Sequence, residues 1–286
     1  MTKRLNNILL KSALEVDLKE THLSIQIYLG GFSFCVYHPK SQKHIAFQYY
    51  EFKEKQKTPE NLLKEFKSIF DANQLLNQSY KKLIVIHQNE LFTTVPNDYL
   101  DKNNLKQYLQ HTVKVLPIDY VSYDSLKPID ANIVYIPFVN INNFLFHKFG
   151  GFDFYHSATL LTKILQEKQK DTSVPKVYIN VYQNSFELLV FEKQELLFLN
   201  SFDFRTAQDF IYYILFVLEQ LQLDPNSVTI ELLGAIEKES ELYEISRKYL
   251  RNLTIYDEKN PCLTSDFDSI PKHAHFSLLN YAQHNK

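Results

Sequence analysis

Residues 23–38 read LSIQIYLGGFSFCVYH, and residues 177–192 read VYINVYQNSFELLVFE. When the two stretches are aligned without a gap, their apolar residues fall at the same positions and Tyr28 coincides with Tyr182. In both stretches, apolar and polar residues alternate on either side of a short turn, which is the pattern of a β-hairpin. The sequence therefore predicts the same hairpin twice, and these two hairpins decide the fold.

The elements predicted after each hairpin also follow one order. A third strand comes first, then a helix, and then a short apolar strand. Thr58 precedes Pro59, and Thr206 precedes Asp209 by three positions, which are common signals for a helix start. The strands and helix starts fall at 43–52, 58 and 83–87 in the first copy, and at 195–204, 206 and 228–234 in the second. We infer a β-β-β-α-β unit that occurs twice in an α/β protein, with mixed sheets flanked by helices.

Further elements extend both copies. We expect helices at 101–112, 140–149, 159–170 and 240–250, and strands at 133–138, 152–156 and 252–258. The stretch DTSVP at 171–175 is the best linker, so we assign residues 1–172 to a first lobe and residues 173–286 to a second. The polar tail from 261 onward is expected to be a solvated, less regular segment.

The bulk composition is that of a globular protein. Hydrophobic residues make up 45%, and the formal net charge of -2 gives no strong field for nucleic acid or an anionic membrane. The two cysteines, Cys35 and Cys262, are far apart, which fits a reducing cytoplasm better than a disulfide framework. The start of the chain lacks the apolar core of a signal peptide, and the most apolar run, 210–218, is too short to cross a bilayer. We expect a cytoplasmic protein that neither binds nucleic acid nor inserts into a membrane.

The helix expected at 206–222 is apolar nearly all round between 210 and 218. Such a helix is usually buried on every side, so we place it between the two halves or against a sheet. The alternative is that one side meets a second subunit, which would make the protein a homodimer. Exposed tyrosines among the 19 in the chain would mark a surface for a protein partner, because tyrosine is enriched at interfaces.

This order of elements, found twice in one chain, resembles the actin-like (ribonuclease H-like) fold. That superfamily includes sugar kinases, the Hsp70 ATPase domain, and the actin-type proteins of pili and cell division. The likeness extends from about residue 23 to residue 257, and the chain is most similar to an uncharacterised bacterial family with an actin-like ATPase fold. It rests on the order and pattern of the elements more than on identical residues.

The resemblance implies three nucleotide motifs, and this chain departs from all three. ATP-hydrolysing members carry Asp-x-Gly in the first hairpin of each half, where aspartate supports the metal and glycine lets backbone N–H groups face phosphate. Here a neutral amide stands in the aspartate place, as Gln26 and Asn180, and tyrosine stands in the glycine place, as Tyr28 and Tyr182. The third motif normally ends a strand in a glycine pair against adenosine, and here only Gly234 is present.

Three functional hypotheses follow. The first is a non-catalytic binding or scaffold protein, a pseudo-ATPase with no cofactor and no catalytic residue, that acts on a protein partner. The second is a nucleotide-binding protein or weak ATPase that holds ATP and Mg²⁺ in the inter-lobe cleft. Its phosphate and adenosine contacts would come from the small and polar residues of the matching loops, Gly30, Gly31, Ser33, Asn184, Ser185 and Gly234. The third is an enzyme of unrelated chemistry, for which the sequence offers no residues.

Two short motifs are weak candidates for metal sites. His273 and His275 are two positions apart, but no third ligand has a recognisable spacing, so we expect them in a solvated tail. Cys35 and His38 fall on opposite faces of one strand because successive side chains alternate, so they cannot share a metal. Cys35 is expected to be a small core residue, and we predict no metal site.

Overall fold

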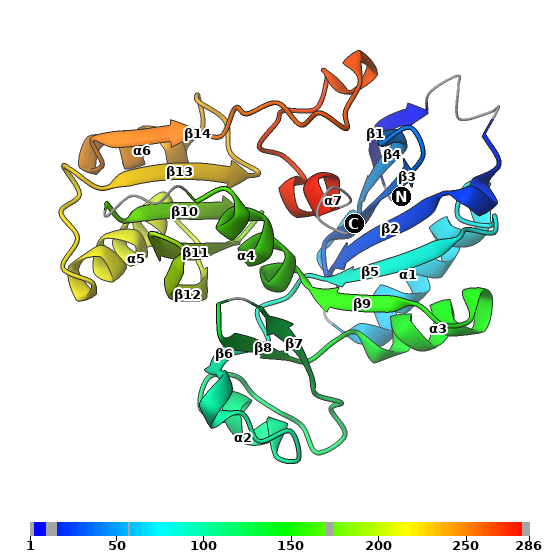
Figure 1. Cartoon of the computed structure of the whole chain (residues 1–286), viewed down its shortest axis with the longest axis horizontal. Coiled ribbons are helices and arrows are strands. Elements are labelled where there is room, and N and C mark those ends of the chain that lie inside the picture. Colours follow the sequence, from blue (N-terminus) through cyan, green and yellow to red (C-terminus); the bar gives the residue numbers. More distant parts are fainter. Residues whose placement is uncertain (1–2, 10–15, 57, 128, 170–173, 282–286) are drawn as a thin grey trace.

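The computed structural model describes residues 3–9, 16–56, 58–127, 129–169 and 174–281. They form two large mixed sheets, each flanked by helices, and a smaller third sheet (Figure 1). The predicted α/β architecture is confirmed. Residues 171–173 of the predicted linker lie outside the described residues, and the lobe boundary there stays a prediction.

The first sheet has the first predicted hairpin at its centre. Its strands are ordered β1-β4-β3-β2-β5-β9. Their bounds are β1 (Lys3–Leu9), β2 (His22–Tyr28), β3 (Gly31–His38), β4 (Lys43–Glu51), β5 (Lys82–His87) and β9 (Asp153–His156). Strands β2, β5 and β9 run parallel, whereas β3 and β4 pair antiparallel. Strand β1, which the sequence pattern does not indicate, pairs antiparallel with β4.

The second sheet repeats five of the six strands of the first, all except the edge strand β1. Its order is β12-β11-β10-β13-β14, with the same parallel and antiparallel pairings as β4-β3-β2-β5-β9. The bounds are β10 (Lys176–Val181), β11 (Ser185–Glu192), β12 (Glu195–Asp203), β13 (Thr229–Gly234) and β14 (Asn252–Ile255). In the two hairpins, Gln26 lies opposite Ser33 and Asn180 lies opposite Glu187. Both predicted hairpins are therefore present, in sheets of equivalent order.

Both predicted helix starts are confirmed by their caps. Helix α1 (Pro59–Ala72) begins after Thr58, whose side chain accepts a hydrogen bond from the N–H of Asn61. Helix α5 (Ala207–Gln220) begins after Thr206, which forms a reciprocal capping box with Asp209. An N-cap of this kind stabilises a helix by about 1 kcal/mol, so each start is fixed locally by the sequence.

A small third sheet is inserted between β5 and the rest of the first half. It contains β6 (Phe92–Pro96), β7 (Ser122–Leu126) and β8 (Ala131–Tyr135) in the order β6-β8-β7, and α2 (Leu105–Leu109) packs against it. Strand β8 was expected over 133–138, and α2 is shorter than the helix expected over 101–112. Strands β6 and β7 were not predicted, because their short mixed sequences show no clear alternation.

Two helices form a layer between the large sheets. Helices α1 and α3 (Val139–Phe149) cover the far face of the first sheet, and α5 and α6 (Glu241–Tyr249) cover the far face of the second (Figure 1). Helices α4 (Ser157–Glu167) and α7 (Phe276–Tyr281) lie between the sheets and pack against each other. Tyr178, Leu189 and Leu233 of the second sheet share a buried cluster with the first sheet, so one core joins the two halves.

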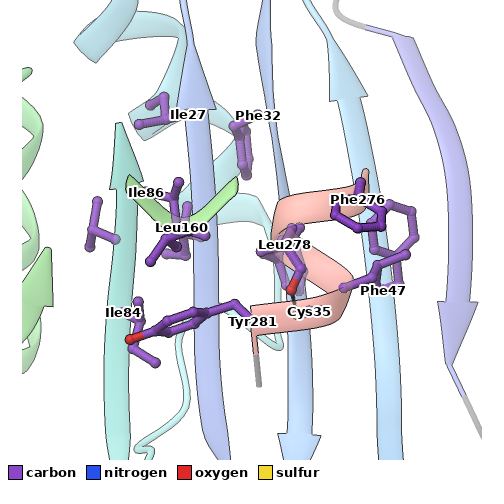
Figure 2. Packing of buried hydrophobic residues seen from close by; sticks show 14 of the residues in the cluster. Ile27, Phe32, Cys35, Phe47, Ile84, Ile86, Leu160, Phe276, Leu278 and Tyr281 are labelled. Carbon is purple, nitrogen blue, oxygen red and sulfur yellow. Dashed lines mark hydrogen bonds between the residues drawn. The ribbon is translucent and has the colours of Figure 1, made fainter. Parts of the chain in front are cut away.

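The prediction of a solvated C-terminal tail is wrong. Every residue of α7 is buried, and Phe276 and Leu278 pack over Phe47 and Cys35 on the first sheet (Figure 2). The physical reason is that the face of this sheet turned toward the second is apolar, and burying it removes that area from water at about 25 cal/mol per Å². The end of the chain, assigned by sequence to the second lobe, thus completes the core of the first.

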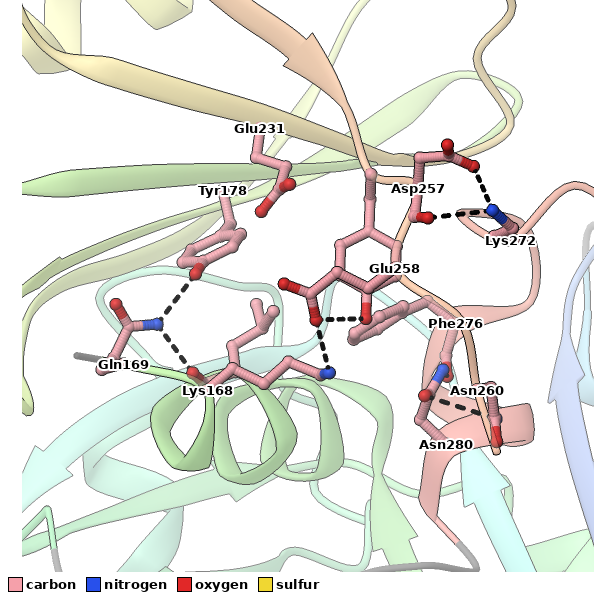
Figure 3. A network of polar contacts seen from close by, with 12 residues as sticks. Lys168, Gln169, Tyr178, Glu231, Asp257, Glu258, Asn260, Lys272, Phe276 and Asn280 are labelled. Carbon is pink, nitrogen blue, oxygen red and sulfur yellow. Dashed lines mark hydrogen bonds and ion pairs between the residues drawn. The ribbon is translucent and has the colours of Figure 1, made fainter. Parts of the chain in front are cut away.

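Polar contacts also hold the segment that leads to α7. Lys168, just after α4, forms an ion pair of 3.0 Å with Glu258, and Lys272 forms one of 2.7 Å with Asp257 (Figure 3). The side chain of Asn260 donates a 2.8 Å hydrogen bond to the carbonyl of Leu279. These contacts link the loop after β14 to both middle-layer helices.

Helix α5 is not buried on every side as predicted. Its Phe210, Ile214 and Leu218 are fully buried against the second sheet, but Tyr212 is 61% exposed and Phe216 is 44% exposed. The helix lies against a sheet, which was one of the two predicted places, and because it is on the outer face of that sheet one of its sides is exposed. Within the described residues, none of the helices has the length and apolar character needed to cross a membrane.

Buried histidines are a second feature of the core. The Nδ1 atoms of His87 and His156 accept hydrogen bonds from the backbone N–H groups of Phe138 and Ala158, each at 3.2 Å. Both rings are therefore neutral and protonated on Nε2, which contacts Asn142 and the Asn89 carbonyl. Burial lowers the pKa of each of these two histidines to about 3.

We predict that the protein loses stability as the pH falls below about 6.5, the pKa of histidine in an unfolded chain. Below that value the unfolded chain binds protons that the folded His87 and His156 exclude, until the folded pKa near 3 is reached. Between these two pKa values, each such histidine lowers the free energy of unfolding by about 1.4 kcal/mol for every unit that the pH falls. Burial raises the pKa of Asp124 to about 6, and its protonation offsets part of this loss.

The dependence of the free energy of unfolding on pH is best measured by comparing wild type with a variant that lacks one of these histidines. In His156→Asn the amide oxygen can still cap α4 but takes up no proton. Urea unfolding between pH 6 and pH 4 should give a pH slope shallower than wild type by about 1.4 kcal/mol per unit. His147→Asn, at an exposed site on α3, is the control and should leave the slope unchanged. Equal slopes for His156→Asn and wild type would contradict the prediction.

Candidate functional site

A cavity of about 280 Å³ lies where the two hairpins approach each other. Its lining residues come from both hairpins, from β4 and β12, and from the segments that contain Lys55, residues 88–90, residues 234–235 and residues 274–277. Five of the six residues proposed for nucleotide contact are among its lining residues, namely Gly30, Ser33, Asn184, Ser185 and Gly234. The sixth, Gly31, packs against the chain, because a Cβ there would lie 2.2 Å from the Tyr50 carbonyl oxygen.

Tyr28 covers the glycine turn of the first hairpin. A Cβ added to Gly30 would lie 2.8 Å from the Tyr28 ring, and one added to Gly31 would lie 3.0 Å from the Tyr28 hydroxyl. The ring is fixed by a hydrogen bond of 2.8 Å between the hydroxyls of Tyr28 and Tyr49. The two glycines therefore leave room for the Tyr28 ring, which lies against the turn.

Gln26 stands where the resemblance places an aspartate. Its side chain is 8% exposed, and its Nε2 donates a hydrogen bond of 2.5 Å to Oε1 of Gln88. Its Oε1 has no hydrogen-bond partner among the described residues. This amide is neutral, so it cannot supply the charge with which an aspartate supports a metal ion.

The second hairpin holds a buried carboxylate that the sequence analysis missed. Glu187 is 2% exposed, and its Oε2 accepts hydrogen bonds from the Tyr182 hydroxyl at 2.7 Å and the Asn180 amide at 3.2 Å. Its Oε1 accepts a 3.2 Å hydrogen bond from Ser157, the first residue of α4. Burial raises the pKa of Glu187. The only sequence signal was an acidic residue at an inward position of an apolar strand.

Gly234, the remaining glycine of the third motif, is engaged by the C-terminal segment. Its N–H donates to the His273 carbonyl at 2.8 Å, and its carbonyl accepts from Nδ1 of the His273 ring at 2.9 Å. Its φ is +81°, and a Cβ there would lie 2.1 Å from the Val181 carbonyl oxygen. The backbone of Gly234 is thus used to bind the chain's own tail.

The tail also forms one wall of the cavity. The His275 ring packs against Tyr49, with ring centroids 4.8 Å apart, and Phe276 and Ser277 follow it along the wall. Burial lowers the pKa of His275 to about 4, so the ring is neutral at pH 7. Ser277 is 4% exposed, and its Oγ has no hydrogen-bond partner among the described residues.

The charges around the cavity are mainly negative. The lining includes three carboxyl groups, Glu51, Glu90 and Glu187, and one cation, Lys55. The Nζ atom of Lys55 lies 3.8 Å from Oε1 of Glu90, so the two side chains form an ion pair. A triphosphate entering this space would meet more acidic than basic groups, and like charges in a partly buried site repel.

The two short motifs do not converge on a metal. The Cys35 thiol lies 3.7 Å from the Leu278 carbonyl inside the core, whereas the His38 ring bonds to Ser41 at the surface. His273 contacts Gly234, and His275 packs on aromatic rings. In the part of the chain that the structure describes, three His, Cys, Asp or Glu side chains nowhere gather closely enough to hold a metal ion.

The residues present do not fit Mg²⁺-ATP. The places of the two motif aspartates hold Gln26 and Asn180, and both amides point into hydrogen bonds with neighbouring side chains. Tyr28 covers the first turn, and Gly234 is bonded to His273. We therefore derive no chemical step through nucleotide in this cleft.

A family model described as "Protein of unknown function (DUF3822)" matches residues 11–253. The chain belongs to this family. The match covers most of the chain, including both hairpins and β13, and ends before the C-terminal segment that lines the cavity. No curated protein matches the sequence.

Solved structures show the fold of this DUF3822 protein. A Bacteroides thetaiotaomicron protein with an actin-like ATPase fold and unknown function is similar over 88% of this chain and 96% of its own, with a TM-score of 0.75 and 24% identity. A structure of the PilM–PilN type IV pilus biogenesis complex matches over 94% of this chain and 99% of the other, with a TM-score of 0.52 and 12% identity. The actin-like fold expected from the order of elements is confirmed.

We predict that Gly234 is required for packing. Gly234 and Gly150 both have positive φ, +81° and +78°, but a Cβ at Gly150 would meet nothing within 4 Å. Gly150→Ala should cost only the backbone strain, about 1–3 kcal/mol, because its φ of +78° and ψ of −142° are adopted almost only by glycine. Gly234→Ala adds a clash with the Val181 carbonyl and breaks the His273 contact, so it should cost at least about 2 kcal/mol more. Urea unfolding of the two variants measures the difference, and equal losses would contradict the role given to Gly234.

Proposed function

We propose that this protein is a non-catalytic actin-like binding protein, a pseudo-ATPase whose inter-sheet cleft does not take Mg²⁺-ATP. The observation that carries the proposal is the position of Tyr28 over the Gly30-Gly31 turn. Phosphate binding by a turn requires that its backbone N–H groups be open to the ligand. A ring in van der Waals contact with this turn, anchored by Tyr49, blocks that approach.

Two further features support the proposal. At the second turn, the Tyr182 hydroxyl donates a hydrogen bond to Glu187. The second hairpin therefore offers a carboxyl group at a place where a phosphate would need a positive charge. Gly234 has both of its backbone groups bonded to His273, which leaves neither for adenosine. Each of the three places where the fold family contacts nucleotide is thus occupied by this chain's own side chains or tail.

An analogy with PilM suggests that the molecule bound is another protein. PilM, whose structure shares this fold, is part of a complex with PilN. We propose that this protein also serves as a scaffold for another protein, in the cytoplasm, where its buried thiols Cys35 and Cys262 would stay reduced. We further propose that its two lobes, divided near residue 172, arose by internal duplication. The matching strand order and hairpin register support this origin.

The alternative function is atypical nucleotide binding. The observation in its favour is that five of the six residues proposed for nucleotide contact line one cavity. Hydroxyl and amide groups can bind phosphate without aspartate, so the location alone does not separate the two functions. The excess of acidic groups in the lining and the position of Tyr28 against the first turn favour the non-catalytic binding protein.

A ligand titration separates the two functions. Under the proposal, millimolar Mg²⁺-ATP leaves the melting temperature of the full chain unchanged, and no phosphate is released above the buffer rate. A ligand at about one hundred times its dissociation constant would instead raise the free energy of unfolding by about 2.7 kcal/mol. Mg²⁺ with tripolyphosphate is the control for nonspecific anion effects. A melting shift specific to Mg²⁺-ATP, or turnover that depends on protein concentration, would replace the proposal by the alternative.

A further inference from the structure

The two large sheets differ at one edge. In the first sheet, strand β4 is covered by the antiparallel strand β1. Its equivalent in the second sheet, β12, is the last strand in the order, with no neighbour beyond it among the described residues (Figure 1). Strand β12 has nine residues, whereas β14 at the opposite edge has four. An open edge presents a row of unpaired backbone groups to which another strand can bond.

The backbone of β12 shows which groups face this edge. The N–H of Phe204 donates to the carbonyl of Asn184, on the side of β11. Because successive N–H groups of a strand point to alternate sides, those of the odd-numbered residues from 199 to 203 point away from β11. The N–H of Ser201 accordingly donates to the side chain of its neighbour Asn200, at 2.9 Å. The middle of the strand, 196–202, contains none of the charged residues or prolines that discourage pairing at an edge.

An aromatic surface continues from β12 onto helix α5. The ring of Phe202, on β12, stacks on that of Tyr213, with centroids 5.2 Å apart. Tyr212 packs against Tyr213, and Phe216 stacks on Tyr212. Tyr212 is 61% exposed and Phe216 is 44% exposed. A partner at the edge of β12 that also brings a helix would cover this apolar surface and remove it from water.

The sequence of β12 is complementary to itself. A two-fold axis pairs each residue of one copy with its counterpart in reverse order. When the axis passes Asn200, Phe198 lies opposite Phe202 of the second copy, and Glu195 comes beside Arg205 of that copy. Glu195 and Arg205 are exposed, and they carry opposite charges. Opposite charges and aromatic rings at facing positions stabilise an antiparallel pair.

Neighbouring registers are less favourable. A shift of two residues in one direction places Glu195 opposite Asp203, and like charges at facing positions repel. The register centred on Asn200 also sets residues 199 and 201 opposite each other, and both have N–H groups that face the edge. A bulge between Leu196 and Phe198 displaces the pairing of Glu195 by about one residue, which the long side chain of arginine can span.

We propose that β12 pairs antiparallel with β12 of a second copy of this chain, in a two-fold homodimer. One continuous sheet would cross both copies, and the two α5 helices would lie side by side on its outer face. This inference goes beyond the proposed function and does not depend on whether the cleft takes nucleotide.

Sedimentation equilibrium of the full chain tests the dimer, which should form at micromolar concentration. Glu195→Arg and Arg205→Glu should each weaken dimerisation about tenfold, because each sets two pairs of like charges against each other. The double variant, Glu195→Arg with Arg205→Glu, should restore dimerisation. The two residues stand at opposite ends of one strand, so only contact between copies explains this rescue.

Phe216→Ser tests the helix surface and should also weaken the dimer. Phe146→Ser, at a site on α3 that is 60% exposed, is the matched control and should dimerise as wild type does. A chain that stays monomeric up to millimolar concentration would overturn the inference. So would a double charge variant no better than the single ones, or equal effects of Phe216→Ser and Phe146→Ser. These results leave the proposed function standing, since only the Mg²⁺-ATP titration bears on it.

Discussion

The contact on which this structure depends is the pair of hydrogen bonds between Gly234 and His273. Gly234 ends β13 in the second sheet, and three residues after His273 the chain enters α7, which packs on the first sheet. The contact therefore holds the tail at the junction of the two halves. It forms only because residue 234 is glycine, since the positive φ and the nearby Val181 carbonyl leave no space for a Cβ. The backbone of Gly234 therefore contacts the chain's own C-terminal segment.

Tyrosine side chains also line the cavity at both hairpins. Tyr28 and Tyr182 place rings and hydroxyls where glycine would leave the backbone open, and both hydroxyls find hydrogen-bond partners, Tyr49 and Glu187. Burial raises the pKa of both tyrosines, so both hydroxyls stay protonated at physiological pH. The cleft is thereby built from aromatic and neutral polar groups around a few carboxylates. Under the proposed function, this lining opposes the concentrated negative charge of a nucleotide.

The sequence predicted the parts of the fold that local patterns control. Alternation identified both hairpins, and the caps at Thr58 and Thr206 located two helices correctly, because these signals act between residues close in sequence. The tail could not be predicted, because Phe276 and its neighbours are buried by residues such as Phe47 that are far away in the chain. Helix α5 was predicted only in part: its apolar composition correctly indicated that it packs against a sheet, but not which of its sides stays exposed.

Much of the candidate site also depends on contacts between residues that are far apart in the sequence. The motif positions at Gln26, Tyr28, Asn180 and Tyr182 were identified from the resemblance, and the structure brings them to one cavity. The role of Glu187 was missed because Ser157, which donates to its Oε1, is 30 residues away in the chain. The contribution of His275 and Ser277 to the wall was missed together with the burial of the tail.

The most direct test of the account is hydrogen–deuterium exchange at the amides of Gly234 and Leu279, which donate to the carbonyls of His273 and His275. If the tail closes the cleft as a permanent part of the core, both amides should exchange only with global unfolding, since buried core hydrogen bonds open at the full free energy of unfolding. Their protection should be the same with and without millimolar Mg²⁺-ATP. Rapid exchange at both amides, or protection that changes when Mg²⁺-ATP is added, would contradict the account, because the tail would then be a movable cover over a nucleotide site.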